Sequence, residues 1–125
     1  MELTELRGAI DSDHAEIASI VAQIRDASEA LDFGVTKQLL RALQAVEETH
    51  YASEYALMRA AGRDMPAGHQ VEHAQLIETL RSINQTIVVE NLCSVNPRIA
   101  AHLEAALEHM QKSDSELWAM LVETR

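Results

Sequence analysis

Three histidines and one glutamate between positions 50 and 73 stand at a spacing that suits metal binding. His50 and Glu54 are four residues apart, and so are His69 and His73. Residues four apart on an α-helix lie on one face with Cβ atoms about 5–6 Å apart, so each pair can direct two donor atoms at one point. The glycines and proline of segment 61–68 separate the pairs, which should therefore face each other across an antiparallel helical hairpin.

The hydrophobic pattern predicts four amphipathic helices to position these pairs. Apolar residues recur at alternating three- and four-residue steps, the period of a helix with one buried face. The chain has only 4 glycines and 2 prolines and few aromatic residues, which favours helix over strand. We therefore expect an all-α fold, an up-down-up-down antiparallel four-helix bundle. It should form one domain over residues 1–125, with the ligand-bearing bundle at about 10–123.

Capping residues set the expected ends of the first helix. Residues 1–9 show no clear signal and are expected to form a short arm, with Asp11 or Ser12 as the N-cap. Gly34 should close this helix by taking the left-handed conformation, and the second helix should begin near Thr36.

The second half of the chain contains two further start signals. Pro66 suits the first turn of the third helix, which should fray after Val89. Residues 91–96 are expected to form a loop. Asn96-Pro97 should start the fourth helix, which continues to about Glu123, because asparagine is a good N-cap and proline suits the first helical position.

The composition limits the classes of function. Lys plus Arg number 10 and Asp plus Glu number 20, so the formal charge of −10 opposes binding to nucleic acid and to anionic membrane surfaces. The single cysteine, Cys93, cannot form an internal disulfide. No apolar run is long enough to span a bilayer and no leader is evident, so we expect a cytoplasmic protein. The sequence indicates no particular protein partner.

Most of the histidines fall on the inward faces of the predicted helices. A single histidine there is usually a hydrogen-bonded core residue, but five histidines from four helices are not explained as core filling. Buried imidazoles and carboxylates in this number need a shared positive partner, which a metal centre provides. The inward set comprises His14, His50, His69, His73 and His109 with Glu54, and Asp114 lies next to the helix seam.

The chain resembles hemerythrin-domain proteins, in particular the single-domain bacterial hemerythrins. The resemblance covers about residues 10–120, and its motifs are weak singly but strong together, each on its predicted helix. They are Ile10-Asp11-Ser12-Asp13-His14, His50-Tyr51-x-x-Glu54-x-x-x-Met58, His69-x-x-x-His73 and His109-x-x-x-x-Asp114.

This resemblance implies a non-haem di-iron centre in the core of the bundle, completed by an oxo or hydroxo bridge. It assigns seven ligands: His69, His73 and His109 to one iron, His14 and His50 to the other, and Glu54 and Asp114 as bridges between the two.

Donor counting then indicates a function. Three histidines and three bridging groups fill the first iron, whereas two histidines and the same bridges leave one position open on the second. Dioxygen would bind there reversibly, as in an oxygen carrier or store, in a pocket lined by Ile17 and Leu57. No catalytic residue is assigned, and we expect oxygen binding rather than catalysis.

Other readings stay open at this point. The same centre could serve an oxygen or redox sensor that acts through a partner, an iron reserve, or an enzyme acting on peroxide or nitric oxide. The segment 69–73 also matches the H-x-x-E-H pattern of zinc proteases, but that leaves the remaining ligands unexplained. His102 is expected to be structural or partly exposed, and Glu47 either orients a ligand imidazole or is a solvated charge. Ala105 stands where many relatives have tryptophan, which bears on the pocket lining.

Overall fold

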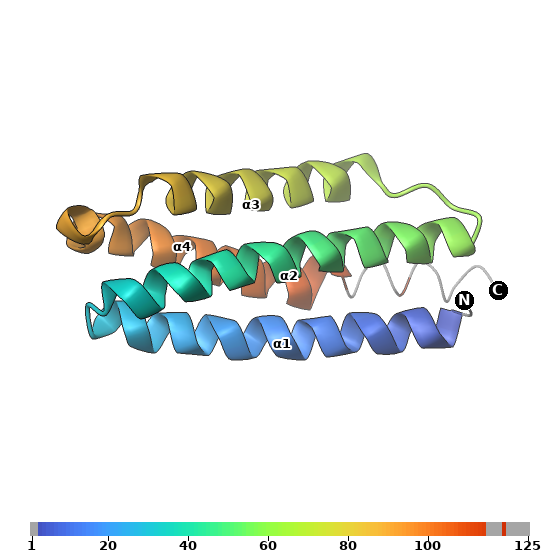
Figure 1. Ribbon diagram of the computed structural model, residues 1–125. Coiled ribbons are helices and arrows are strands. Elements are labelled where there is room, and N and C mark those ends of the chain that lie inside the picture. The colour runs from blue at the N-terminus through green and yellow to red at the C-terminus, as the bar shows by residue number, and fades with distance from the viewer. Residues whose placement is uncertain (1–2, 115–118, 120–125) are drawn as a thin grey trace.

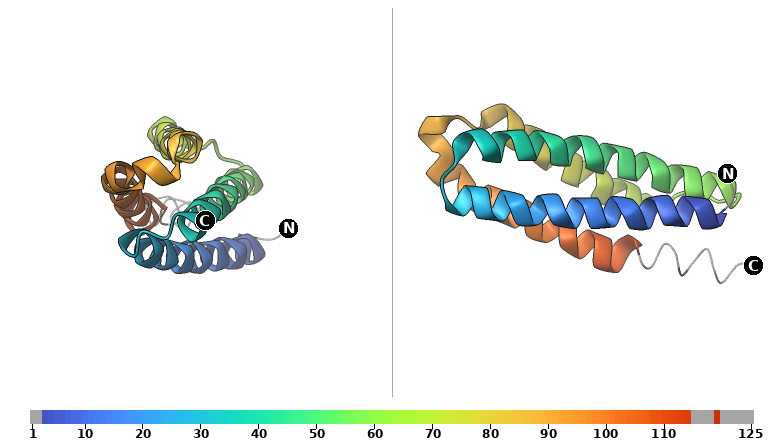
Figure 2. Two further views of the ribbon diagram at one scale, coloured as in Figure 1. Left: turned by 60° about the vertical axis from the view of Figure 1, so that its left-hand side comes forward. Right: turned by 60° about the horizontal axis from the view of Figure 1, so that its bottom comes forward.

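The structure is a computed structural model that describes residues 3–114 and residue 119, and its elements are helices joined by short connections (Figure 1). Successive long helices run in opposite directions, and the four surround a common axis, with α2 diagonally opposite α4 (Figure 2). The all-α, up-down-up-down four-helix bundle predicted from the sequence is confirmed. In order, the elements are α1 Leu3–Glu29, α2 Phe33–Ala60, α3 Ala67–Thr86, the 3₁₀-helix η1 Val89–Asn91, α4 Leu92–His109 and the π-helical segment η2 Met110–Asp114.

The first helix begins earlier than the sequence predicted. Residues 3–9 are helical and not an arm, and Asp11 and Ser12 are exposed positions within α1 instead of its N-cap. Leucine, glutamate and arginine in this segment are good helix formers, and they outweigh the roughly 0.5–1 kcal/mol cost of Gly8 in a helix interior. The extension adds about two turns to α1 ahead of His14.

The turn between α1 and α2 differs from the predicted one. Leu31, with φ of 56°, takes the left-handed conformation, whereas Gly34 lies inside α2. The backbone N–H of Asp32 donates to Ala27 O at 2.9 Å and that of Leu31 to Ser28 O at 3.1 Å, the pattern of a Schellman motif. The Asp32 side chain also caps α2 by accepting from Val35 N at 3.2 Å. Because this cap starts α2 at Phe33, the left-handed residue must precede it.

The connection from α3 to α4 also shifts a predicted boundary. Asn91 holds it by accepting from Val88 N at 2.9 Å and donating to Thr86 O at 2.8 Å. The fourth helix therefore starts at Leu92, and Pro97 lies inside it. Asn96 is not an N-cap, because its side-chain amide donates to Ser28 O at 3.1 Å and so ties α4 to the end of α1.

An apolar core fills the part of the bundle away from the chain termini. It is built from isoleucine, leucine and valine of all four long helices, and a fully buried side chain of this kind contributes roughly 1.5–3 kcal/mol. Stability from this core does not depend on a bound metal. Its members are Ile17, Ile20, Val21, Ile24, Leu40, Leu43, Leu80, Ile83, Ile87, Leu92, Val95, Ile99 and Leu103.

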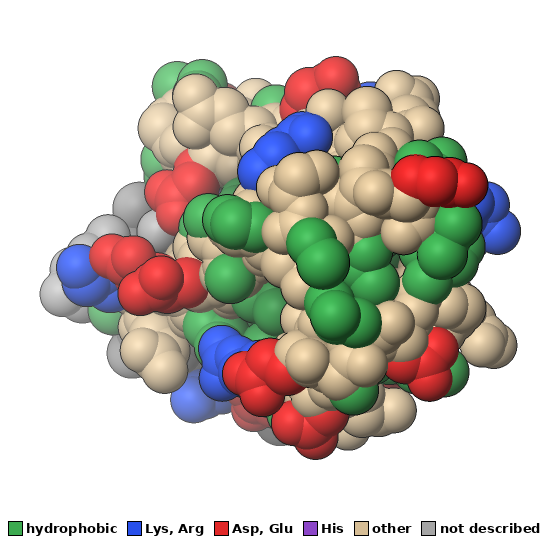
Figure 3. All heavy atoms as spheres, turned by 90° about the vertical axis from the view of Figure 1, so that its left-hand side faces the viewer, with side chains coloured by type: hydrophobic (Ala, Val, Ile, Leu, Met, Phe, Trp, Pro, Cys, Tyr) green, Lys and Arg blue, Asp and Glu red, His purple; other side chains and the backbone are tan. Residues whose placement is uncertain are grey.

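The end of the bundle that carries the α1–α2 turn and η1 exposes several apolar side chains. Leu31, Val35, Val88 and Val89 are 43–62 % exposed, and Figure 3 shows hydrophobic side chains in the middle of this face with acidic ones around them. Within the described residues, no helix is sufficiently long and apolar to cross a membrane.

Candidate metal centre

The four long helices bring the predicted histidines toward one region of the interior. His14 comes from α1, His50 and Glu54 from α2, and His109 from α4. His69 and His73 come from α3, one helical turn apart on its buried face. All are buried except His14, which is half-buried, so the apolar stripe of each helix carries them inward.

The tightest cluster joins α2, α3 and α4. Glu54, His69, His73 and His109 each offer a ligand atom, and these atoms all lie within 4.8 Å of one another. Glu54 Oε1 is 3.0 Å from His69 Nε2 and 3.0 Å from His73 Nε2. The side chain of Glu54 is only 1 % exposed, so its charge is shielded from water.

The other carboxylate oxygen of Glu54 faces a second pair of imidazoles. Glu54 Oε2 lies 3.3 Å from His50 Nε2, and that nitrogen lies 3.3 Å from His14 Nε2. The glutamate therefore stands between three histidines on one side and two on the other.

The spacing of these donor atoms fits metal coordination. Bonds of about 2.1–2.2 Å at right angles place neighbouring donors about 3.0–3.1 Å apart, close to the observed 3.0–3.3 Å. His73 is buried, and its Nδ1 makes no hydrogen bond. Imidazole nitrogens with a carboxylate suit borderline divalent ions such as iron, zinc and cobalt. These residues fit a resident metal.

Burial sets the protonation of His73. It lowers the pKa of this imidazole from its usual value of 6.5, and the nearby His69 and His109 act in the same direction, against Glu54. The neutral form, which is the one that donates to a metal, is therefore favoured near neutral pH.

A carboxylate outside the cluster orients His109, and another lies near His50. His109 Nδ1 pairs with Glu72 Oε1 at 2.5 Å, which directs Nε2 of the same ring inward. His50 Nδ1 lies 3.6 Å from Asp13 Oδ2. Neither carboxylate was predicted in this role. The spacing of Glu72 on its own helix gives no signal for this contact, because its partner His109 lies on α4.

Tyr51 packs directly on the cluster. Its ring stacks on that of His73 with centroids 3.8 Å apart and an interplanar angle of 13°, and meets His109 edge-on at 5.9 Å. A rigid aromatic plane of this kind restricts rotation of the imidazole. Tyr51 is 7 % exposed, so it also separates the cluster from solvent.

The predicted second bridge, Asp114, is the last residue of η2, and its side chain lies outside what the structure describes. The assignment of Asp114 as a bridging ligand therefore stays a prediction.

The remaining predicted residues are placed as follows. Ile17 and Leu57 lie one turn after His14 and Glu54 respectively and are 1 % and 2 % exposed. They thus border the region of His14 and His50, while their role as a pocket lining stays a prediction. His102 is 2 % exposed and so is not a surface residue.

A helical bundle with a buried histidine and glutamate cluster defines a class, the helical metal-binding proteins. The family model described as Hemerythrin HHE cation binding domain matches residues 6–121, which is nearly the whole chain. The chain belongs to the hemerythrin family and is a cation-binding protein, as the sequence motifs predicted. No curated protein and no solved structure matched it.

Proposed function

We propose that this chain binds two iron ions and uses them to bind dioxygen reversibly, as an oxygen carrier or store. The observation that carries the proposal is the unequal arrangement around Glu54. Its Oε1 faces the nitrogens of α3, and its Oε2 faces His50 next to His14. One ion would take three histidines and the other two, so the second has room for a ligand.

Each side chain has a defined part in this proposal. His69, His73 and His109 would hold the first ion, and His14 and His50 the second. Glu54 would bridge them, and Asp114 would do so from the end of η2, as the family resemblance implies. A pair of ferrous ions held by these residues would supply two electrons and one open position for dioxygen.

The ligand set supports carriage over irreversible oxidation. Imidazoles are neutral, so five of them with two carboxylates offset less positive charge than a set made mainly of carboxylates. The ferric state should then be less favoured and oxygen released more readily. Ile17 and Leu57 would keep water from the open position, because both are almost fully buried.

The test is an optical titration of the anaerobic ferrous protein with oxygen, preceded by metal analysis. We expect two irons per chain and a visible absorption band that appears on oxygenation and disappears on degassing over several cycles. One zinc and no iron would contradict the di-iron assignment. Immediate conversion to a stable ferric form, with turnover of peroxide or nitric oxide at about 1 s⁻¹ or faster, would identify an enzyme instead.

A further inference from the structure

A second glutamate–histidine pair lies inside the bundle, apart from the cluster described above. Glu47 on α2 and His102 on α4 are 1 % and 2 % exposed. Glu47 Oε2 and His102 Nε2 are 3.6 Å apart, beyond the range of a hydrogen bond. Glu47 Oε2 and both ring nitrogens of His102 are buried without a hydrogen-bond partner. A buried carboxylate in this state needs a positive partner.

The pair repeats the geometry of the principal cluster one heptad away. Glu47 precedes Glu54 by seven residues and His102 precedes His109 by seven, which is about 10.5 Å along each helix. At both levels the diagonally opposed helices α2 and α4 direct a carboxylate and an imidazole toward each other. The two levels differ on α3, which supplies His69 and His73 to the cluster but Leu76 and Leu80 beside the second pair.

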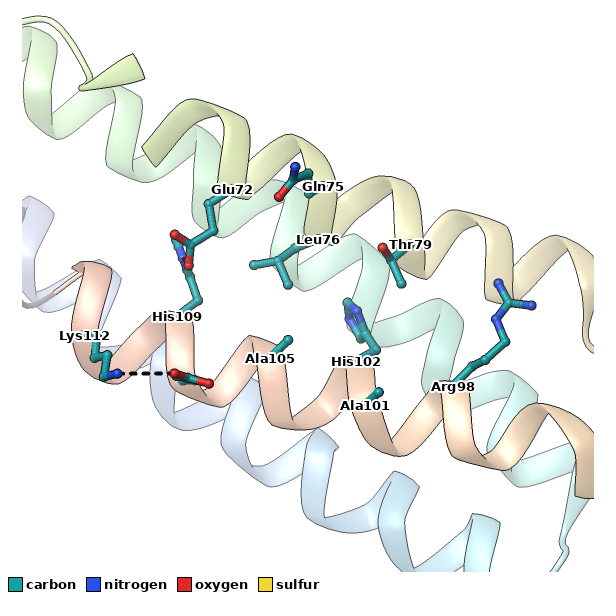
Figure 4. Close-up of a pocket in the computed structure, with 11 residues that line it drawn as sticks. Glu72, Gln75, Leu76, Thr79, Arg98, Ala101, His102, Ala105, His109 and Lys112 are labelled. Atoms are coloured by element: carbon teal, nitrogen blue, oxygen red, sulfur yellow. Dashed lines mark hydrogen bonds and ion pairs between the residues drawn. The ribbon is translucent and has the colours of Figure 1, made fainter. Parts of the chain in front are cut away.

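A groove between α3 and α4 gives access to this level. Its volume is about 580 Å³, and His102 and His109 both line it, with Ala105 between them and Ala101 next to His102 (Figure 4). The two alanines leave space beside the imidazoles. Thr79 of α3 lines the same groove and offers a hydroxyl oxygen. The groove therefore runs beside His102, whose own side chain is buried.

We propose that Glu47 and His102 form a second site for a borderline divalent cation such as Zn²⁺ or Fe²⁺, with water from the groove completing its coordination. Bonds of about 2.0–2.2 Å at tetrahedral angles place two donors about 3.3–3.6 Å apart, which matches Glu47 Oε2 and His102 Nε2. With two protein ligands this site is weaker than the principal one. The formal charge of −10 favours cation entry.

The test adds zinc alone to the full-length protein with its principal centre already loaded, and measures bound metal by equilibrium dialysis. Wild type should take up one equivalent of zinc. Glu47→Gln and His102→Gln should bind zinc at this site at least about tenfold more weakly, since even changes to residues that only support a ligand lower metal affinity about 10–100-fold. Both variants should retain the metal of the principal centre. Glu48→Gln is the matched control, because Glu48 is the next residue on α2 and its side chain is 47 % exposed.

Two results would overturn this site. The first is zinc uptake that is the same in wild type and both variants, which would make the pair a buried ion pair only. The second is loss of the principal metal in either variant, which would make the pair part of that centre. Zinc-soaked wild-type crystals test the site without any substitution: an anomalous peak about 2.0–2.2 Å from Glu47 Oε2 and His102 Nε2 is expected, and its absence refutes the site. Neither result bears on the oxygen binding proposed above, which the optical titration tests separately.

Discussion

Replacing Glu54 by glutamine should stabilise the metal-free protein and destabilise the metal-loaded one. Glu54 is 1 % exposed, and its nearest nitrogens are those of histidines at 3.0–3.3 Å. The pKa of His73 is lowered by burial in spite of this carboxylate, so that imidazole provides no full positive charge near neutral pH. Without a metal, the buried carboxylate of Glu54 therefore lacks a cation from His73.

The magnitude follows from the cost of burying charge. Replacing a buried ion pair by well-packed apolar residues of similar volume often stabilises a protein by about 1–4 kcal/mol, because taking charges out of water is costly; a buried carboxylate without a charged partner carries the same cost. We expect Glu54→Gln to raise the free energy of unfolding of the metal-free protein by about 2 kcal/mol, or the Tm by roughly 5–10 °C. In the metal-loaded protein the order reverses. The amide is neutral and a poor bridging ligand, so the variant loses the roughly 3 kcal/mol that a metal at 100 times its Kd contributes.

Urea unfolding of both proteins, with metal and after chelation, measures this reversal. Glu48→Gln should change the free energy of unfolding by less than about 0.5 kcal/mol in both states, because Glu48 is half exposed. A metal-free Glu54→Gln that is less stable than wild type would show that protonated imidazoles already compensate the carboxylate. A variant that keeps its full metal content would show that Glu54 is not a ligand. Either result refutes the reasoning.

Three further outcomes are expected. His73→Ala should lose metal, measured by elemental analysis, and lower the Tm of the loaded protein, because it removes a proposed ligand and metal binding is coupled to folding. Burial lowers the pKa of His73 below 6.5, so the unfolded chain binds more protons than the folded chain at pH values between the lowered pKa and 6.5. The metal-free wild type should therefore lose stability as the pH falls through that range. In urea unfolding, His73→Gln should make the free energy of unfolding less dependent on pH. Leu31→Gly should raise the free energy of unfolding by about 0.5–1 kcal/mol, and the Tm with it, because Leu31 has φ of 56°, which glycine adopts without strain. A lower Tm would contradict the assigned turn.

The sequence alone determined the fold class and the inward direction of the histidines and Glu54. Both follow from local rules: apolar residues at helical spacing define a buried face, and a histidine on that face must point inward with it. The pairs at i,i+4, His50 with Glu54 and His69 with His73, needed no knowledge of the other helices. The family resemblance came from these same positions and agrees with the match over residues 6–121.

The helix ends were predicted less well, because several local signals compete and either a stronger cap or a contact between helices decides among them. Asn96-Pro97 is a good start signal in isolation, yet the Asn96 amide bonds to Ser28 O of α1 and the helix begins at Leu92. Gly34 is a good stop signal, yet the Asp32 cap fixes the start of α2 and leaves Leu31 to take the left-handed conformation.

Only the tertiary structure decided which polar groups of different helices meet. The pairing of Glu72 with His109 and of Glu47 with His102 depends on the rotation and axial offset of α3 and α2 against α4. Local sequence spacing fixes the face of a helix but neither of these quantities. They are set by how the side chains of all four helices pack together, and so the carboxylate that each histidine meets could not be read from its own helix.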